Sequence, residues 1–351
     1  MSEAGKVAVL LVNLGTPVAP TAAALRPYLA QFLGDPRVID LRPRWWWKLV
    51  LHGLILRIRP RRSARAYASI WLPEGSPLRV YSERLAAALG EALASRCAPA
   101  PQVALAMTYG EPAVAATLAR LHGEGVRRVL LLPLFPQYSA TSTGAAIDTA
   151  ADALKAMRWP PELRLVNDYH DDAGYLDALA ASVRAHWQQQ GRGDRLLLSF
   201  HGIPQRYVEL GDPYAAQCRA TAGALRHRLG LGEGELLVSF QSRVGREPWL
   251  QPYTDVTVKQ LGREGVGRLD VLCPGFAVDC LETLEEIALR ADADFRAAGG
   301  RELRYIPALN ASPGHVEALA TLALRHLGGW GCAERRGPET GDQEPGRAPA
   351  P

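Results

Sequence analysis

Short apolar runs alternate along this chain with longer segments of helical periodicity. The apolar runs predict buried strands at 7–12, 103–107, 127–133, 163–167, 195–200, 235–240, 268–273 and 302–306. Most of the intervening segments repeat apolar residues three or four positions apart, which predicts helices at 112–123, 144–157, 172–190, 213–229, 279–298 and 312–326. Because continuous apolar strands alternate with helices, we expect a doubly wound α/β protein whose parallel sheets are covered on both faces.

Two predicted strand ends in the first half of the chain resemble two in the second half. LLVNLGTP (10–17) resembles LLSFHGIP (197–204), and VLLLPLF (129–135) resembles LDVLCPGF (269–276). We therefore expect two similar domains, at 1–165 and 166–332, with a basic, Trp-rich lid inserted into the first at about 36–80. Ligands of such sheets bind beyond the carboxyl ends of the strands, so the repeated motifs should face one cleft.

The composition sets broad limits on the function. The chain has 351 residues, 48% hydrophobic and 22% charged, which is enough to bury a core, and its net charge of +4 gives no argument for a nucleic-acid partner. Five cysteines without CxxC or CxxH spacing favour reduced thiols, a cytoplasmic location and no structural zinc. No run approaches the roughly 20 apolar residues of a membrane-spanning helix. The Pro- and Gly-rich tail at 333–351 is expected to be disordered, and the chain to be a monomer.

One titratable side chain stands at the end of a predicted strand. His201 directly follows LLLSF, and Leu14 is its equivalent in the first half of the chain. One wall of the expected cleft is therefore apolar and the other can exchange protons near neutral pH. The alternative is a turn residue whose ring is satisfied by local hydrogen bonds.

A cluster of acidic residues follows another strand end. Asp279, Glu282 and Glu286 are three and four positions apart, so they should share one face of a helix that begins near Asp279. Such a cluster either binds a cation or holds protons at a raised apparent pKa. Acidic residues on a solvated helix face are the alternative. Together with His201, the cluster favours a site that accepts protons at one place and handles protons or a weakly held divalent cation at another.

The segment at 41–73 is the most unusual part of the chain. It contains eight Arg or Lys, no Asp or Glu, and three consecutive Trp, so without its charges the remainder would carry −4 (4 − 8). A helix with Trp and Leu on one side and basic residues on the other would lie at a membrane surface. The same residues suit a flat apolar ligand with carboxylate arms. An ordinary lid packed on the core is the third interpretation.

Five motifs together resemble the ferrochelatase family over about 5–330, most closely its bacterial protoporphyrin-using branch. They are LLVNLGTP, FPQYSATSTG, SFHGIP…GDPY, SFQSRVGREPWLQPYTD and PGFAVDCLETLEEI, in the family's order. The resemblance implies that Fe²⁺ is inserted into protoporphyrin IX, with release of two protons, as the last step of haem biosynthesis. It implies a cytoplasmic enzyme, with peripheral membrane contact through 41–73.

The resemblance also assigns roles to individual residues. It places catalysis and metal binding on His201 and Glu282, and a proton or metal path on Asp279 and Glu286. Porphyrin contacts fall on Leu14, Arg59, Arg62, Tyr67, Ser76, Tyr138 and Trp249, among which Arg59, Arg62 and Ser76 match groups that hold propionates.

No permanently bound cofactor is implied, since Fe²⁺ is a substrate. Relatives of the animal type bind a [2Fe–2S] cluster, but this chain has Ala140 where one cluster cysteine would fall and only Cys332 near its C-terminus. We therefore expect no cluster. Many relatives also have a second histidine where this chain has Cys280, so this chain departs from the family's pattern at that position.

Two other functions share part of this pattern. A cobalt or nickel chelatase acting on a more reduced tetrapyrrole would have the same duplicated architecture, but its acidic substrate fits the apolar lid less well. A haem or porphyrin carrier would need the pocket and the arginines, yet it would not need the acidic cluster opposite His201.

Overall fold

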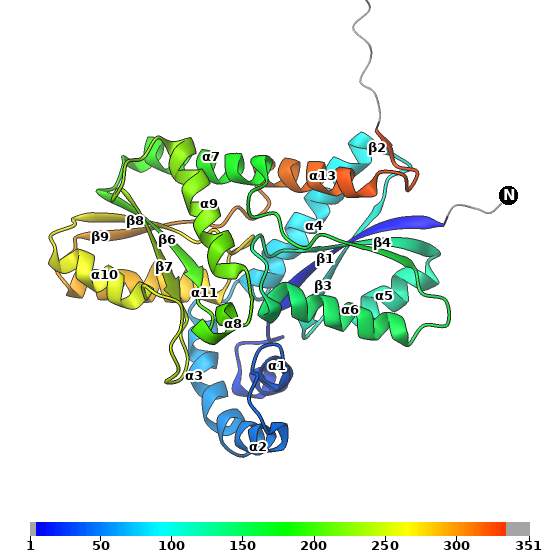
Figure 1. The fold of residues 1–351 in the computed structure, drawn as a ribbon, viewed down its shortest axis with the longest axis horizontal. Coiled ribbons are helices and arrows are strands. Elements are labelled where there is room, and N and C mark those ends of the chain that lie inside the picture. The colour runs from blue at the N-terminus through cyan, green and yellow to red at the C-terminus, as the bar shows by residue number, and fades with distance from the viewer. Residues whose placement is uncertain (1–4, 335–351) are drawn as a thin grey trace, which may run out of the picture.

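The computed structural model describes residues 5–334, and these form two parallel four-stranded sheets (Figure 1). The first sheet has the order β3-β1-β4-β5 and contains β1 (Lys6–Gly15), β3 (Gln102–Tyr109), β4 (Val126–Pro133) and β5 (Glu162–Leu165). The second has the order β7-β6-β8-β9 and contains β6 (Arg195–His201), β7 (Leu236–Gln241), β8 (Arg268–Leu272) and β9 (Glu302–Ile306). The predicted α/β class and all the predicted strands are confirmed.

The internal repeat seen in the motifs is also a repeat of topology. In each sheet the first strand along the chain is central, with the second strand on one side and the third on the other. The histidine strand β6 therefore occupies in its sheet the place that β1 occupies in the other. Leu14 and His201 consequently lie at equivalent strand ends, as the sequence predicted.

Both faces of the central strand β1 are buried, which explains its uninterrupted apolar sequence. Along β1, Val9 and Leu11 face a core that continues into the second sheet, whereas Ala8, Leu10 and Val12 face a separate core. Successive side chains of a strand point to opposite faces, so a strand covered on both sides needs apolar residues at every position.

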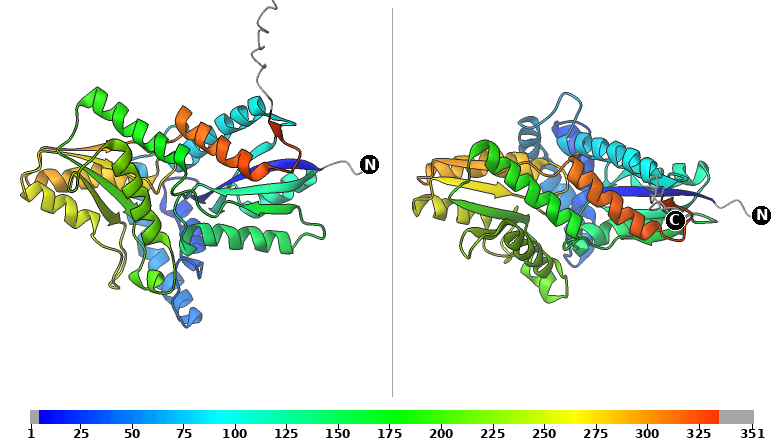
Figure 2. Two further views of the ribbon diagram at one scale, coloured as in Figure 1. Left: turned by 45° about the horizontal axis from the view of Figure 1, so that its top comes forward. Right: turned by 90° about the horizontal axis from the view of Figure 1, so that it is seen from above.

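Helices cover the two sheets in a common layer on one side and in separate layers on the other (Figures 1 and 2). The common layer contains α4 (Pro77–Arg96), α7 (Ala173–Gln190), α9 (Tyr214–Leu229) and α13 (Pro313–Leu327). On the other side, α5 (Val114–Gly123) and α6 (Ala145–Lys155) cover the first sheet. The second sheet is covered there by α10 (Thr254–Arg263), the π-helix η3 (Leu284–Ala291) and α12 (Asp292–Ala297).

The C-terminal helix α13 follows the second sheet in the chain but packs against the first half as well. Arg96 at the end of α4 donates to Glu317 on α13 at 2.6 Å. Beyond the helix, the Trp330 ring lies under the guanidinium of Arg164 and its Nε1 donates to Glu162 at 2.9 Å. The end of the described chain is therefore fixed to β5 and α4 of the first half.

The same region holds a contact between Cys97 and Cys332, with the Cα atoms 5.4 Å apart. It adjoins an antiparallel pair of short strands, β2 (Cys97–Ala98) and β10 (Ala333–Glu334). A separation of 235 residues gave no sign of this contact, and the reduced state of the five cysteines stays a prediction. The predicted tail begins with β10, and its remainder, 335–351, lies outside the described residues.

The predicted lid is a group of helices that projects from the body of the molecule (Figure 1). The predicted segment, about 36–80, contains α2 (Arg44–Val50), the π-helix η1 (Leu51–Ile55) and α3 (Leu56–Ala68). The preceding helix α1 (Ala22–Gly34), outside the predicted bounds, packs with them. These helices have an apolar cluster of their own, to which α1 contributes Leu25 and α3 contributes Leu56. Of the three tryptophans only Trp47 joins it, and its Nε1 donates to the carbonyl oxygen of Leu33 at 2.8 Å. The lid is thus a packed unit.

A buried histidine in α13 should make stability depend on pH. His315 is fully buried, its Nδ1 lies 2.7 Å from the carbonyl oxygen of Asn310, and burial lowers its pKa to about 4. An unfolded histidine has a pKa of about 6.5, so between these values the unfolded chain binds a proton that the folded protein excludes. Through this group the free energy of unfolding should fall by up to about 3 kcal/mol as the pH drops from about 6.5 to 4.

Replacing His315 with glutamine should remove this contribution. Urea unfolding of the wild type and His315→Gln at about pH 7.5 and pH 5 measures it, since other groups titrate alike in both proteins. We expect the wild type to lose more stability than the variant between the two conditions. Equal losses would contradict a buried neutral imidazole.

Candidate functional site

His201 ends β6 at the carboxyl edge of the second sheet, and its ring is partly exposed. Its Nδ1 lies 2.6 Å from the carbonyl oxygen of Gly202. A carbonyl oxygen can only accept, so this contact assigns the ring proton to Nδ1 and leaves the lone pair on Nε2. The rings of Trp249 and Phe276 have centroids 6.5 Å from the histidine ring. His201 is therefore flanked by aromatic rings and has a nitrogen free to accept a proton.

The turn after His201 depends on the absence of a side chain at Gly202. A Cβ atom there would lie 2.9 Å from the carbonyl oxygen of Gln241 and 3.1 Å from the Trp249 ring. The Gly202 N–H donates to that same carbonyl oxygen at 2.8 Å. Glycine thus lets the histidine strand, the end of β7 and the Trp249 ring approach closely.

Gln241, at the end of β7, connects His201 to the acidic segment. Gln241 and His201 are register partners across β6 and β7. The Gln241 Oε1 accepts from the Ser199 hydroxyl at 2.6 Å, and its Nε2 donates to the backbone carbonyl oxygen of Glu282 at 2.7 Å. The sequence analysis missed this residue, although a buried polar side chain at a predicted strand end was a signal that could have identified it.

The acidic segment is not one regular helix. It begins with the short helix α11 (Leu281–Thr283) and continues as η3, so Glu282 and Glu286 are helical but Asp279 precedes the helix. Asp279 is buried, and its carboxylate accepts from the Tyr305 hydroxyl at 2.6 Å and from Asn310 Nδ2 at 2.7 Å. The expectation that the three carboxylates share one helix face is therefore wrong for Asp279, because these contacts hold it outside the helix.

Glu286 is bound by the residue that follows Gln241. Its Oε1 accepts from the Ser242 N–H at 2.8 Å, and its Oε2 accepts from the Ser242 hydroxyl at 2.5 Å. Ser242 has a φ of +66°, in the left-handed region that a serine rarely adopts. The end of β7 therefore contacts the acidic segment at both Glu282 and Glu286.

The groups around Glu282 are two tyrosine hydroxyls, one thiol and one basic group. Burial, and after it the charge of Glu282, raises the pKa of Tyr28 and of the Cys280 thiol, so both stay protonated at neutral pH. Burial also raises the pKa of Tyr67, with further increases from Tyr28 and Glu282. Burial lowers the pKa of Arg59, which Glu282 partly opposes. Tyr28 belongs to none of the motifs, and sequence reasoning missed it.

The lid contributes the apolar part of this region. Leu14, Trp71 and Leu281 pack at the border of the lid cluster that contains Tyr67, so the end of β1, the lid and the acidic segment are in contact. Ser76, predicted to hold a propionate, is buried and accepts from the Thr16 hydroxyl at 2.6 Å.

The predicted site residues thus fall into distinct environments. Leu14, Arg59, Tyr67 and Glu282 come together, and Gln241 connects them to His201 and its neighbour Trp249. Arg62 is exposed on α3.

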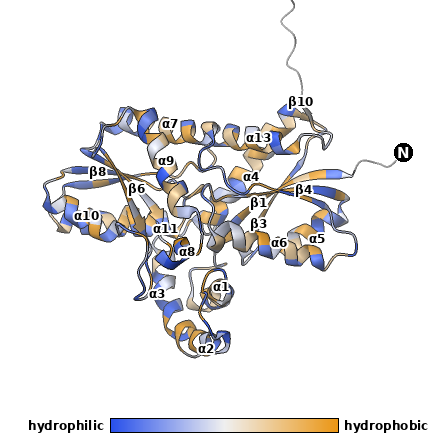
Figure 3. Ribbon diagram, in the orientation of Figure 1, coloured by the Kyte–Doolittle hydropathy of each residue, from blue (hydrophilic) through white to orange (hydrophobic). Residues whose placement is uncertain are grey.

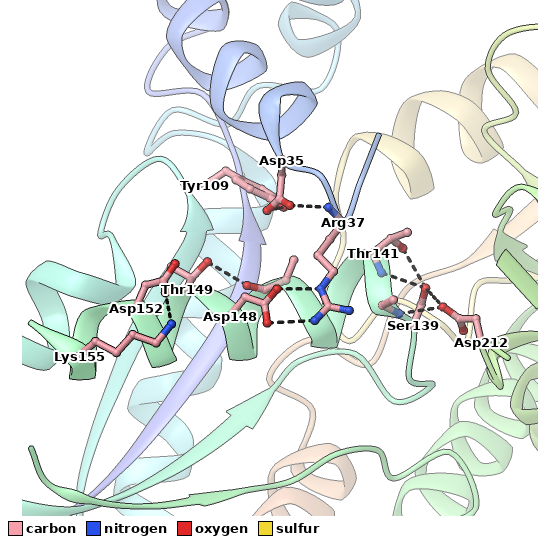
Figure 4. A network of polar contacts seen from close by, with 12 residues as sticks. Asp35, Arg37, Tyr109, Ser139, Thr141, Asp148, Thr149, Asp152, Lys155 and Asp212 are labelled. Carbon is pink, nitrogen blue, oxygen red and sulfur yellow. Dashed lines mark hydrogen bonds and ion pairs between the residues drawn. The ribbon is translucent and has the colours of Figure 1, made fainter. Parts of the chain in front are cut away.

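Tyr138 lines a cavity where the two halves meet. Asp212 of the second half accepts from the Ser139 hydroxyl at 2.9 Å and from the Ala140 N–H at 2.8 Å, next to the Arg37–Asp148 ion pair (Figure 4). The cavity has a volume of about 310 Å³, and its lining is Pro36, Arg37, Asp40, Tyr138, Ala140, Tyr207, Leu210, Gly211 and Asp212. The lining includes neither His201 nor Glu282.

Other potential metal ligands gather after β5. Atoms of Asp168, His170 and Asp171 lie within 4.8 Å of one another. Asp168 Oδ1 is 2.7 Å from His170 Nδ1, so an ion pair or hydrogen bond already accounts for two of the three residues. These residues therefore give no reason to move the candidate site away from His201 and Glu282.

Substituting Gly202 should disturb this arrangement directly. The new methyl group of Gly202→Ala would overlap the Gln241 carbonyl oxygen, so the free energy of unfolding should fall by about 1–3 kcal/mol. Gly223→Ala is the matched control, because a Cβ on this helical glycine meets nothing within 4 Å. Urea unfolding of both variants tests the turn, and equal stability of the two would mean that it has room for a side chain.

Comparisons with solved structures place the fold among chelatases. SirB from Bacillus subtilis, solved with Fe³⁺, matches with a TM-score of 0.52 and 11% identity over 91% of this chain and 95% of its own. DR2241 from Deinococcus radiodurans, described as similar to chelatases, matches with a TM-score of 0.52 and 14% identity over 95% of this chain and 57% of its own. At these identities the likeness establishes the fold alone.

Comparisons of sequence are much closer. The ferrochelatase of Thioalkalivibrio sulfidiphilus is 56% identical over 92% of this chain and 87% of its own length. The ferrochelatase of Neisseria gonorrhoeae is 50% identical over 94% of this chain and 96% of its own. The family model named Ferrochelatase matches residues 6–327. The resemblance found in the five motifs is confirmed: the chain belongs to the ferrochelatase family.

Proposed function

We propose that this chain inserts Fe²⁺ into protoporphyrin IX to form protohaem, as a metal chelatase of the lyase class. The observation that carries the proposal is the contact of Gln241 with Glu282, because Gln241 is also the register partner of His201. A proton acceptor and a carboxylate thereby lie at one sheet edge, beside an apolar lid. Membership of the ferrochelatase family supports this chemistry over a porphyrin carrier and over a cobalt or nickel chelatase.

His201 acts as the base in this proposal. A free porphyrin is nearly flat and carries two pyrrole protons, so the metal enters only after the ring bends and the protons leave. The lone pair on Nε2 of His201 can take one of these protons. Contacts of Trp249 and Leu14 with the outer ring supply the binding energy that favours the bent form, away from the nitrogen atoms.

Glu282 and Glu286 handle the second proton or the incoming Fe²⁺. Carboxylate oxygens bind a divalent ion without retaining it as tightly as a thiolate would. The Cys280 thiol stays protonated, so it competes weakly for the metal. We assign Arg59 and Arg62 of the lid, with Ser76, to the propionates, since guanidinium groups pair well with carboxylates.

The same proposal takes protoporphyrin as the substrate and expects no [2Fe–2S] cluster. Leu14 and Tyr67 give an apolar surface that suits protoporphyrin better than coproporphyrin, which has four carboxylates. Among the described cysteines, Cys97 and Cys332 lie side by side, while Cys218, Cys273 and Cys280 are buried. This arrangement favours a protein without a [2Fe–2S] cluster, and analysis of acid-labile sulfide in the purified protein tests that assignment.

Two substitutions test the reaction. Anaerobic insertion of Fe²⁺, followed by the loss of protoporphyrin fluorescence, should be rapid in the wild type and fall at least about 100-fold in His201→Ala and Glu282→Gln. Porphyrin binding should remain, because neither change removes an apolar contact. The controls are His227→Ala, an exposed residue on α9, and Glu285→Gln, which changes a carboxylate on the same helical segment.

Three results would contradict parts of the proposal. Porphyrin binding without metallation by the wild type would support a carrier. Wild-type turnover in either His201→Ala or Glu282→Gln would remove that residue from the reaction. Equal losses in the control variants would show that the assay responds to any change of charge.

We also propose that the projecting lid contacts an anionic membrane surface. Trp45 and Leu49 on α2 are each 64% exposed, and Ile58 on α3 is exposed to the same extent. Exposed basic residues accompany them, including Lys48 and Arg57, and α2 shows the mixture of hydrophobic and hydrophilic positions in Figure 3. Among the described residues no helix is long and apolar enough to cross a membrane. The contact is therefore proposed for the bilayer surface, while the cytoplasmic location and the monomeric state stay predictions.

Sedimentation with lipid vesicles tests this contact. The wild type should bind vesicles that contain anionic phospholipid, and Trp45→Ser with Leu49→Ser should reduce binding at least about tenfold through lost apolar burial. High salt should weaken the wild-type binding, because basic residues contribute about 1 kcal/mol each near such a surface. Trp159→Ser is the control, since Trp159 is 66% exposed outside the lid. Equal effects of the lid and control changes would exclude the lid as the contact.

A further inference from the structure

Both carboxylate oxygens of Asp279 accept hydrogen bonds from neighbouring residues. Oδ1 accepts from the Tyr305 hydroxyl at 2.6 Å, the Thr283 hydroxyl at 3.1 Å and the Ala308 N–H at 3.3 Å. Oδ2 accepts from Asn310 Nδ2 at 2.7 Å. Only 3% of Asp279 is exposed. Four donors and burial together fix the position of this carboxylate.

Two of the donors lie on or directly after the last strand of the second sheet. Tyr305 lies in β9, and Asn310 lies in the connection between β9 and α13. Asn310 has a φ of +48°, and its carbonyl oxygen is 2.7 Å from Nδ1 of the buried His315. The Asn310 side chain also accepts from the Asp279 N–H at 2.9 Å. The Asn310 side chain is thus hydrogen-bonded to Asp279 through both its amide oxygen and its amide nitrogen.

Asp279 passes this constraint to the turn that carries Glu282. The Thr283 hydroxyl that donates to Asp279 also accepts from the Cys280 N–H at 3.0 Å. Glu282 lies between these two residues in the short helix α11. On the other side, Gln241 donates to the Glu282 carbonyl oxygen. The backbone of Glu282 is therefore fixed from two directions, by β7 and by the β9–α13 connection.

We propose that Tyr305 and Asn310 are positioning residues for Glu282 and that they act through Asp279. This inference rests on the proposed role of Glu282 in metal insertion. Asp279 then serves as the anchor of the acidic segment and not as a station on a proton or metal path. A displacement of a reacting group by about 1 Å can lower a rate about 100-fold, so a fixed Glu282 backbone matters for turnover more than for porphyrin binding.

Tyr305→Phe tests the inference with the smallest change, since it removes only the hydroxyl that donates to Asp279. We expect kcat for Fe²⁺ insertion to fall at least about tenfold, while the KM and the Kd for porphyrin change less than about twofold. Tyr169→Phe is the matched control. Tyr169 is 3% exposed, and its hydroxyl has no hydrogen-bond partner among the described residues.

Asn310→Gly provides a second, independent variant. Glycine adopts a φ of +48° without strain, so this change removes the amide and leaves the backbone conformation accessible. It should give the same separation of kcat from porphyrin binding. Thermal unfolding and the porphyrin-binding stoichiometry of each variant show how much protein is folded, so kcat is expressed per folded molecule.

Glu282→Gln, measured in parallel, separates this inference from the proposed function. If Glu282→Gln is inactive and both Tyr305→Phe and Asn310→Gly lose kcat but bind porphyrin normally, the positioning role is supported. If Glu282→Gln is inactive while Tyr305→Phe matches Tyr169→Phe, the positioning role is overturned and the proposed function stands. A loss of kcat and porphyrin binding together overturns it in favour of a purely structural role. Full turnover in Glu282→Gln overturns both the assignment of Glu282 and the positioning role.

Discussion

The side-chain amide of Gln241 holds the two parts of the site in a fixed relation. It is buried, and its oxygen and nitrogen are bonded to chemically different partners, the Ser199 hydroxyl and the Glu282 carbonyl oxygen. A carbonyl oxygen can only accept, so the amide nitrogen must face Glu282 and the amide oxygen must face Ser199. Neither a carboxylate nor an aliphatic side chain could satisfy both partners. The histidine strand and the acidic segment therefore share one buried, directional connection.

Several of the titratable groups next to Glu282 are neutral. The groups next to Glu282 include the hydroxyls of Tyr28 and Tyr67 and the thiol of Cys280, all with pKa values raised by burial and therefore neutral. Arg59 supplies positive charge from the lid. A carboxylate among neutral donors keeps a stronger field than one surrounded by ions and water, because little screens it. Such a setting suits a site that must attract a cation and then release it into another ligand.

Much of this arrangement follows from local sequence. Continuous apolar runs specified the strands, and the repeated motifs specified which strand ends are equivalent, so the positions of Leu14 and His201 were predictable. Periodicity also found the acidic segment, but it could not show where the helix begins. That point is decided by Tyr305 and Asn310, which hold Asp279 outside the first turn.

Other features depend on packing between distant segments. Gln241 and Tyr28 have roles that only their three-dimensional neighbours reveal. The three consecutive tryptophans give no local sign that Trp47 is buried while Trp45 is exposed. The contact of Cys97 with Cys332 likewise requires the C-terminal segment to return to the first half. In each case the deciding contact joins residues that are far apart in sequence or on different elements.

The return of α13 to the first half has a consequence for how the protein is made. The first sheet and α4 leave the ribosome long before α13, which packs against them and whose Glu317 binds Arg96. During synthesis, the face of α4 that meets α13 must therefore remain uncovered until the last helix has emerged. The two halves are similar in sequence and topology. The nascent chain nevertheless cannot complete the packing of the first half until nearly all of the second half has been synthesised.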